Sequence, residues 1–357
     1  MMCSGIYRYC LWCFKDTHAT GSLRDTIPGE ERIVMIVVTG GAGFIGSAVV
    51  WKLNTQGVDD IVIVDRLGMS EKWKNLVNGR FADYLDKEDF LELVLDDAVP
   101  FDVEAIVHLG ACSSTTELDA DYLMENNYRY TAQLARWAVE KDVRFIYASS
   151  AATYGDGSSG FSDDNRVTTA LRPINMYGYS KQLFDLWALR NRLDEKITGI
   201  KFFNVFGPNE YHKGEMRSVI HKSFGQIRET GKVKLFKSYR PDFGDGEQKR
   251  DFVYVKDCAD VIWWFLENRS VTGLFNLGTG HARTWNDLTR AVFDAMGIPS
   301  EIEYIEMPET IRSHYQYFTE AQIHKLRATG CPVQTMSLED AVSDYVNHYL
   351  EKGPRHL

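Results

Sequence analysis

The sequence predicts an α/β protein built on a doubly wound parallel (Rossmann) sheet, with a smaller mixed α/β lobe. Two observations predict this fold. From Ile33 onward, continuous apolar runs typical of buried parallel strands alternate with helical stretches. A glycine-rich turn also stands between the first run and the first helix. After Gly207 the alternation stops, so we expect one domain over residues 33–206 and a second lobe over residues 207–357, with some later strands returning to the larger sheet.

The elements of the first domain follow from short apolar runs separated by turn residues and helix-forming stretches. We predict strands at Ile33–Val38, Ile61–Val64, Ala105–Val107, Phe145–Ala148 and Gly199–Asn204. Helices are predicted over Gly43–Gln56, Lys87–Leu95, Asn127–Lys141 and Tyr179–Asn191. In the second lobe we predict a helix over Met216–Thr230 and short strands at Asp251–Val255 and Phe275–Leu277.

Composition and charge exclude several classes of protein. The formal net charge is -10, which argues against nonspecific binding to nucleic acid or to anionic lipid. The sequence contains no run of apolar residues long enough to span a membrane. The six cysteines form neither a disulfide framework nor a zinc pattern, because the CxxC of Cys10 and Cys13 has no partner pair. We therefore expect a cytoplasmic protein without a metal, a membrane partner or a nucleic-acid partner.

The first 34 residues differ in character from the remainder of the chain. The apolar stretch Ile6–Phe14 is interrupted by Arg8 and lacks the features of a signal peptide, and a polar stretch follows it. We expect residues 1–32 to be a disordered extension, or the working start to be Met35. The alternative is an interfacial anchor.

The glycine-rich turn Thr39–Gly46 has the context of a dinucleotide-binding fingerprint, with a strand before it and a helix after it. Gly40 would make the tight turn, Gly43 would let the backbone approach a pyrophosphate, and Gly46 would let the helix pack on the strand. The helix N-terminus would then hold the diphosphate. The first domain is thus predicted to bind NAD or NADP.

The choice between the two cofactors depends on three residues after the second strand. Asp65 stands where an acid accepts the adenosine ribose hydroxyls, which favours NAD. Arg66 follows at once and can neutralise a 2′-phosphate. Lys72 adds positive charge nearby and favours NADP, with NAD still open.

A catalytic set is indicated by Tyr177 and Lys181, which stand four apart and share one face if the segment is helical. A phenol is a poor base at neutral pH, but a neighbouring ammonium and an oxidised nicotinamide both favour the phenolate. Tyr177 can then exchange a proton with an alcohol while hydride leaves. Ser150, at the carboxyl end of a predicted strand, would hydrogen-bond the reacting oxygen.

These segments together resemble the extended short-chain dehydrogenases. The resemblance rests on the fingerprint, on Ala148–Gly155, on the YxxxK frame and on Arg250–Val255, and it extends from Met35 to about Leu350. Dehydratases of that group carry an Asp-Glu pair beside the serine. Here Ala151 and Ala152 stand at those positions, which favours an epimerase.

Four further segments resemble one branch, the ADP-glyceromanno-heptose 6-epimerase family. They are Gly110–Glu117, Asn204–Gly214, Ala82–Phe90 and His314–Thr319. The resemblance implies interconversion of the D-glycero and L-glycero forms of ADP-manno-heptose for the lipopolysaccharide inner core, and a homo-oligomer, a pentamer in that family. It implies that Tyr177 and Lys213 transfer protons while Ser150 and Lys181 assist.

The resemblance also assigns binding residues. The implied cofactor contacts are Gly40, Gly43, Phe44, Ile45, Gly46, Asp65, Arg66, Lys72, Lys87, Leu109, Gly110, Ala111, Cys112, Ser113, Asn126, Tyr177, Lys181, Val205 and Lys213. The implied substrate contacts are Ser114, Asn204, Glu215, Lys222, Phe236, Arg250 and Tyr315. The chain departs from the family at Arg66, often Asn there, at Glu215, often Ser, and at Lys222, often His. The stretch Lys237–Gln248 is longer than in the family.

Physical reasoning supports two proton-transfer groups, because inverting a secondary alcohol removes hydride from one face and returns it to the other. Lys213 can serve as a second base if desolvation lowers its pKa; the simpler interpretation is a phosphate-binding or solvated lysine. Lys213, Arg217 and His221 are spaced by four, so a helix there would present a basic stripe. Together with Lys249 and Arg250, that stripe is our candidate for the substrate diphosphate.

Two alternatives remain open from the sequence. A UDP-hexose 4-epimerase would share every cofactor and catalytic residue named above. A dinucleotide-binding regulatory protein that has lost catalysis would show a broken Ser/Tyr/Lys set, whereas all three residues are present here.

Overall fold

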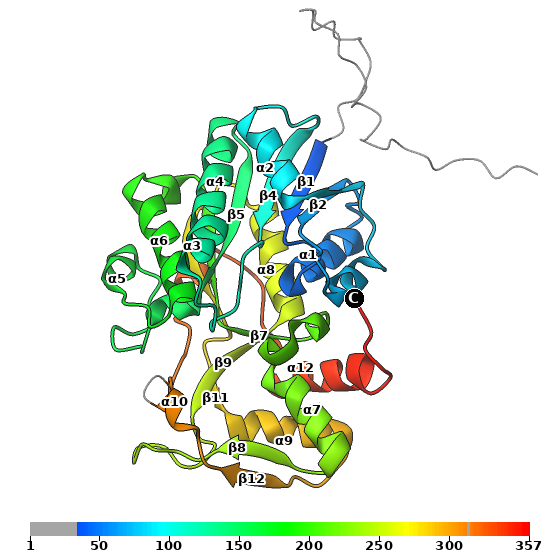
Figure 1. Cartoon of the computed structure of the whole chain (residues 1–357), viewed down its shortest axis with the longest axis vertical. Coiled ribbons are helices and arrows are strands. Elements are labelled where there is room, and N and C mark those ends of the chain that lie inside the picture. The colour runs from blue at the N-terminus through cyan, green and yellow to red at the C-terminus, as the bar shows by residue number, and fades with distance from the viewer. Residues whose placement is uncertain (1–33, 313–314) are drawn as a thin grey trace, which may run out of the picture.

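The computed structural model describes residues 34–312 and 315–357 (Figure 1). The predictions for the extension, for the CxxC of Cys10 and Cys13, for Ile33 and for His314 lie outside the described residues. A large sheet with its helices forms one part of the described chain, and a smaller lobe that contains α7, α9, β8 and β12 forms the other (Figure 1).

The large sheet has seven strands in the order β10-β6-β5-β4-β1-β2-β3, and every neighbouring pair is parallel. The predicted doubly wound α/β fold is confirmed. The strands are β1 (Val34–Thr39), β2 (Ile61–Asp65), β3 (Asp83–Asp86), β4 (Asp102–His108), β5 (Arg144–Ser150), β6 (Thr198–Phe202) and β10 (Gly273–Leu277). Because β10 pairs with β6, the prediction that Phe275–Leu277 belongs to the smaller lobe is wrong, whereas the expectation that some later strands return to the large sheet is met.

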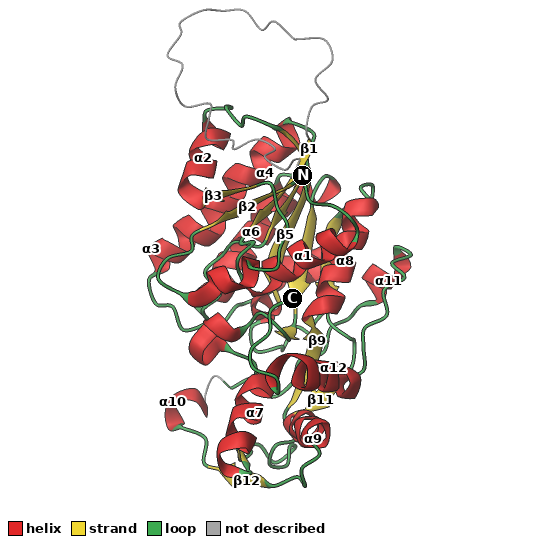
Figure 2. Ribbon diagram, turned by 90° about the vertical axis from the view of Figure 1, so that its right-hand side faces the viewer, coloured by secondary structure: helices red, strands yellow, loops and turns green. Residues whose placement is uncertain are grey.

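Helices cover both faces of this sheet, as Figure 2 shows, with α2 and α4 on one side of the strands and α1 and α8 on the other. Alternate residues of β1 explain the two layers. Ile36 and Val38 pack in one core with residues of α1 and α8, whereas Met35 and Val37 pack in the other with residues of α2, α4 and α6. These helices are α1 (Phe44–Thr55), α2 (Lys87–Leu95), α4 (Tyr130–Glu140), α6 (Met176–Arg190) and α8 (Val255–Glu267).

The smaller lobe has a core of its own, formed by residues such as Phe224, Leu235, Leu288 and Tyr345. Its helices are α7 (Val219–Thr230), α9 (Trp285–Met296) and α12 (Leu338–Tyr345). Its sheets have the orders β11-β9-β7 and β12-β8. Their strands are β7 (Asn204–Phe206), β8 (Val233–Phe236), β9 (Lys249–Tyr254), β11 (Ala282–Thr284) and β12 (Ile302–Ile305).

Short helices connect the larger elements. They are η2 (Glu71–Leu76), α3 (Ala120–Leu123), η3 (Met124–Arg129), η4 (Ala151–Tyr154), α5 (Asn165–Ala170), η5 (Leu193–Glu195), η6 (Tyr211–Met216), α10 (Glu309–Arg312), α11 (His324–Ala328) and η7 (Val346–Leu350). The predicted helix over Met216–Thr230 begins only at Val219, because Ser218 caps α7 by accepting a hydrogen bond from the His221 amide. Gly214 also has φ 52 within η6. The predicted basic stripe of Lys213, Arg217 and His221 on one helix is therefore wrong.

The last residues of the chain lie against two of these short helices, beside α1 (Figure 1). The His356 Nδ1 lies 2.8 Å from the Asn75 Oδ1 of η2. The Leu357 amide donates to the Asn209 Oδ1 at 3.0 Å, directly before η6. The C-terminal residues thus connect η2 to the segment that leads into η6. Within residues 34–312 and 315–357, no helix is long and apolar enough to cross a membrane.

Candidate active site

A cleft of about 640 Å³ opens at the carboxyl edge of the large sheet. Its walls come from the turn after β1, the start of α1, the segment after β2, the loop after β4 and η6. This is the crevice between β1 and β4 where the strand order reverses and where open α/β folds bind ligands. The predicted residues that line it are Gly40, Gly43, Phe44, Ile45, Gly46, Asp65, Arg66, Lys72, Leu109, Gly110, Ala111, Cys112, Ser113, Ser114 and Lys213.

The glycine-rich turn has the geometry that its sequence predicts. Gly40 has φ +67, and a Cβ there would meet the Gly110 amide nitrogen at 2.6 Å. A Cβ on Gly46 would lie 2.0 Å from the Gly40 carbonyl oxygen, so only glycine lets α1 pack this closely on the turn. Gly43 begins α1 without any side-chain cap, which leaves the first amides of the helix without a side-chain partner. This set of donors fits a diphosphate.

The Asp65 carboxylate at the end of β2 already has three partners in the chain. It accepts hydrogen bonds from the amides of Ala42 and Arg66 at 2.9 and 2.7 Å, and it pairs with the Lys72 ammonium at 2.6 Å. Asp65 therefore connects the glycine-rich turn to the segment that carries Lys72. The Arg66 side chain is exposed at the cleft wall.

A smaller cavity of about 150 Å³ adjoins this end of the cleft and shares Asp65 and Lys72 with it. Lys87 and Asn126, both predicted cofactor contacts, line it. The Lys87 Nζ donates to the Asn126 Oδ1 at 2.8 Å, and the Lys87 ammonium also lies 3.0 Å from the Glu88 carboxylate.

The predicted catalytic residues lie where β5 and α6 meet. Asn175 caps α6, and Tyr177 and Lys181 both lie on this helix, one turn apart. The Tyr177 and Ser150 side chains share a hydrogen bond, and the Lys181 Nζ donates to the Ala148 carbonyl at 2.8 Å. Ala148 is also part of the cleft wall, which connects this set to the cavity.

Burial dominates the titration of both groups. Burial raises the pKa of Tyr177, and the hydrogen bond with Ser150 opposes that shift. Burial lowers the pKa of Lys181 to about 8, with the Asp185 carboxylate opposing. In the protein alone, Tyr177 is thus a neutral phenol. The predicted phenolate would form only with an oxidised nicotinamide bound beside it.

Lys213 reaches the cleft from η6, on the side of α1. Its ammonium lies 5.3 Å from the centre of the Phe44 ring, and burial lowers its pKa, with Glu210 opposing. Its neighbour His212 also lines the cleft, and burial lowers the pKa of that imidazole to about 4. A desolvated lysine at this position meets the physical requirement for a second base.

The predicted substrate residues fall into separate groups. Arg250 stacks over the rings of Trp285 and Tyr315 at 5.7 and 5.5 Å, and Phe236 packs edge-on to Tyr315. The Trp285 Nε1 donates to the Tyr315 hydroxyl at 3.0 Å. Phe236, Arg250 and Tyr315 therefore form one cluster in the smaller lobe, with Trp285 as a member that the sequence analysis did not name.

The other predicted residues lie apart from that cluster. Lys222 pairs with Glu215, its Nζ donating to the Glu215 carbonyl at 2.6 Å and lying 3.4 Å from the carboxylate. Asn204 is exposed at the start of β7, and Val205 packs on the core beneath α1 and α8. None of these four residues lines the 640 Å³ cleft.

The sequence analysis also missed several residues of the cleft wall. The missed residues after β2 could have been found, because they lie between the predicted cofactor contacts Asp65 and Lys72. No sequence pattern pointed to Tyr122 or Met216. The missed residues are Leu67, Gly68, Met69, Ser70, Tyr122, Ala148, His212 and Met216.

The chain is similar to known proteins in sequence and in structure. Residues 36–278 match the model of the NAD dependent epimerase/dehydratase family. An ADP-L-glycero-D-manno-heptose-6-epimerase of Nitratidesulfovibrio vulgaris is 60% identical over 90% of this chain and 100% of its own length. The Helicobacter pylori enzyme of that name is similar in structure, with a TM-score of 0.73 and 28% identity over 88% of this chain and 95% of its own. A UDP-glucose 4-epimerase of Thermotoga maritima follows, with a TM-score of 0.69 and 26% identity over 88% and 98% of the two chains.

Proposed function

Because the chain belongs to the NAD dependent epimerase/dehydratase family, we propose that it inverts C6 of ADP-manno-heptose. The reaction converts the D-glycero form to the L-glycero form and supplies heptose for the lipopolysaccharide inner core. The observation that carries this proposal is the 60% identity, over 100% of its length, to a relative that bears the name of this activity. The cleft, the Ser/Tyr/Lys set and the desolvated Lys213 supply the chemistry that an epimerase needs.

We propose NADP as the cofactor, held in the 640 Å³ cleft and the adjoining cavity. When bound, its nicotinamide would take a hydride from the substrate carbon and return it to the opposite face. The uncapped start of α1 would hold the diphosphate. Arg66 and Lys72 would hold the 2′-phosphate, because Asp65 is already neutralised by Lys72 and does not repel it.

The proton transfers are assigned to Tyr177 and Lys213, one for each face of the sugar. Tyr177 would accept the alcohol proton, with Ser150 donating a hydrogen bond to the reacting oxygen and Lys181 supplying positive charge. Lys213, desolvated beside Phe44, would return or accept the proton on the other side. The transient ketone would turn over between the two steps.

The sugar nucleotide is assigned to the smaller lobe and the mouth of the cleft. Arg250 and Tyr315 with Phe236 would contact the ADP portion, where the buried guanidinium supplies the positive charge that an acidic protein must gather locally. Ser114 and Asn204 would contact the sugar, and Glu215 and Lys222 would close the site. We further infer a homo-oligomer in the cytoplasm.

The test is to incubate the purified protein with ADP-, UDP- and GDP-sugars and to follow epimer formation by NMR. Inversion at C6 of ADP-manno-heptose alone is the expected result. The second candidate, a UDP-hexose 4-epimerase, is favoured by the similarity to the Thermotoga maritima structure; inversion of UDP-glucose without turnover of the heptose would replace our proposal with that one.

A further inference from the structure

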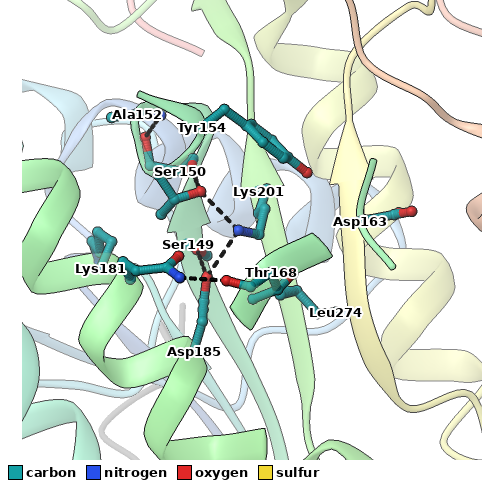
Figure 3. A network of polar contacts seen from close by, with 12 residues as sticks. Ser149, Ser150, Ala152, Tyr154, Asp163, Thr168, Lys181, Asp185, Lys201 and Leu274 are labelled. Carbon is teal, nitrogen blue, oxygen red and sulfur yellow. Dashed lines mark hydrogen bonds and ion pairs between the residues drawn. The ribbon is translucent and has the colours of Figure 1, made fainter. Parts of the chain in front are cut away.

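A completely buried ion pair lies behind the Ser/Tyr/Lys set. Lys201 of β6 and Asp185 of α6 are both 0% exposed, and the ammonium lies 3.2 Å from the carboxylate. Figure 3 shows the Lys201 ammonium pointing toward Asp185 beside the strand end that carries Ser149 and Ser150. Lys201 also lies over the Tyr154 ring at 4.8 Å. An ammonium and a carboxylate are thus buried together next to the proposed reacting groups.

Both members of the pair hold the segment that carries Ser150. The Ser149 hydroxyl donates to Asp185 at 2.7 Å, so the carboxylate fixes the residue before Ser150. The Lys201 ammonium donates to the Thr153 hydroxyl at 2.7 Å, and that hydroxyl donates to the Ser150 carbonyl at 2.8 Å. The ion pair therefore reaches Ser150 from both sides along the chain.

The pair also acts on Lys181, because Asp185 follows it by one turn of α6. The groups around the Lys181 ammonium come from several elements: the Ala148 carbonyl of β5, Asp185, Cys112 in the loop after β4, and His108 of β4. Burial lowers the pKa of His108 to about 3, so this imidazole is neutral in the working range. Asp185 and Cys112 oppose the burial that lowers the pKa of Lys181.

Stability alone does not explain such a pair. Taking two charges out of water costs free energy that their attraction recovers only in part, and well-packed apolar residues of similar volume are often as stable. A buried ion pair is therefore better explained by what it positions. Here it positions the one turn, η4, that follows the proposed catalytic serine.

We propose that Lys201 and Asp185 are positioning residues for the reaction, which hold Ser150 in its reactive place and supply the negative charge that keeps the Lys181 ammonium at the site. The proposal rests on the proposed function in one respect, that Ser150, Tyr177 and Lys181 are the reacting set. Neither Lys201 nor Asp185 touches the cleft, and both act through their neighbours.

The first test replaces both charges at once. The double variant Asp185→Leu/Lys201→Met leaves no uncompensated charge, but it removes the acceptor of the Tyr147 and Ser149 hydroxyls. We therefore expect a lower melting temperature, with the fold and cofactor binding retained at the assay temperature. The value of kcat should nevertheless fall by about 10²-fold, since misplacing a reacting group by about 1 Å has an effect of that size. The matched control is Asp344→Leu/Lys256→Met. It removes a partly buried ion pair whose charged atoms are 2.7 Å apart and which lies away from the site, so kcat should be unchanged.

The second test measures the charge effect without any substrate. In Asp185→Asn/Lys201→Met the carboxylate charge is lost and no uncompensated buried charge remains. The ammonium form of Lys181 is then less favoured, and its pKa should fall from about 8 by about one unit. NMR of protein labelled with ¹³C at the lysine Cε reads that pKa directly. The alkaline limb of the kcat profile should move to lower pH by the same amount.

The outcomes separate this inference from the proposed function. If the wild type does not turn over ADP-manno-heptose, the proposed function fails, and the NMR titration still decides the role of Asp185. An unchanged Lys181 titration in Asp185→Asn/Lys201→Met, or wild-type kcat in Asp185→Leu/Lys201→Met, would overturn the inference. A loss of kcat that comes together with a loss of cofactor binding or of the fold at the assay temperature would overturn it as well, because it would indicate a purely structural pair.

Discussion

The cofactor side of the cleft and the smaller lobe differ in how their predicted residues come together. On the cofactor side, contacts come from backbone turns at the ends of neighbouring parallel strands, and the predicted residues share one cleft. In the lobe, contacts come from long side chains distant in sequence, as where Arg250 stacks on Tyr315. The difference teaches that a cleft built from backbone at strand ends is readable from local sequence. A cluster of distant side chains is not, and Phe236, Arg250 and Tyr315 were named only through the family resemblance.

The largest effect is expected for Tyr177→Phe, because Tyr177 is assigned to the reaction itself, where the cofactor side and the substrate side meet. Loss of a general acid/base typically lowers the rate by about 10²- to 10⁴-fold, and the remaining ring should keep the packing of α6. NMR of epimer formation measures the rate, and retained cofactor checks the fold. Tyr179→Phe is the control, because Tyr179 is 46% exposed on the same helix. Equal losses in both variants would contradict the assignment.

Lys213→Met comes next and tests whether the cofactor side supplies a second base. We expect kcat to fall by about 10²-fold with cofactor still bound, since the variant removes the charge and keeps most of the apolar stem. Steady-state kinetics separates the two interpretations. If KM rises while kcat is untouched, Lys213 is a phosphate anchor and the two-base assignment is wrong.

The prediction of the fold succeeded where the period of apolar residues was clear, and that of the glycine-rich turn where only glycine fits the backbone. The Cβ of any other residue at Gly46 would lie 2.0 Å from a carbonyl oxygen, so that position was readable. The sequence could not show that Gly214 breaks the segment after Lys213, because spacing alone does not reveal a turn with φ 52. Nor could it place Phe275–Leu277 in the large sheet, since strand partners far apart in sequence leave no local pattern.

Lys72→Met sharpens the comparison on the cofactor side. Lys72 pairs with Asp65 at 2.6 Å, and its loss leaves that carboxylate without its countercharge where the 2′-phosphate would bind. We expect the affinity for NADP to fall by about 10- to 100-fold, as for the loss of a charged hydrogen bond, while that for NAD changes little. Calorimetric titration with each dinucleotide measures this. An equal loss for both would assign Lys72 to structure. Lys74→Met, which removes an exposed ion pair with Glu71, is the control.

Arg250→Met tests the smaller lobe. Its guanidinium donates to the Lys249 and Gln316 carbonyls and stacks on two rings, so a methionine should fill the space without the charge. We expect KM for the sugar nucleotide to rise by about 10- to 100-fold with NADP affinity unchanged, from the loss of one charged hydrogen bond of about 1.5–3 kcal/mol. Weaker NADP binding would show that the two regions are coupled rather than separate.

The smallest effect is expected at the C-terminal residues, which connect the two short helices beside the cleft. The His356 Nδ1 lies 2.8 Å from the Asn75 Oδ1, and the Asn75 Nδ2 donates to the Ala42 carbonyl of the glycine-rich turn at 3.0 Å. The same Asn75 amide lies 3.3 Å from the Nδ1 of His212, the neighbour of Lys213. His356→Ala should therefore weaken NADP binding by only about 2- to 10-fold, the equivalent of one net hydrogen bond.

Because the imidazole stacks edge-on against Tyr211 at 5.1 Å, His356→Phe keeps that contact and loses only the hydrogen bond. If His356→Phe binds NADP like His356→Ala, the hydrogen bond to Asn75 transmits the effect; if it binds like the wild type, ring packing alone is responsible, and the C-terminal residues do not reach the glycine-rich turn through Asn75.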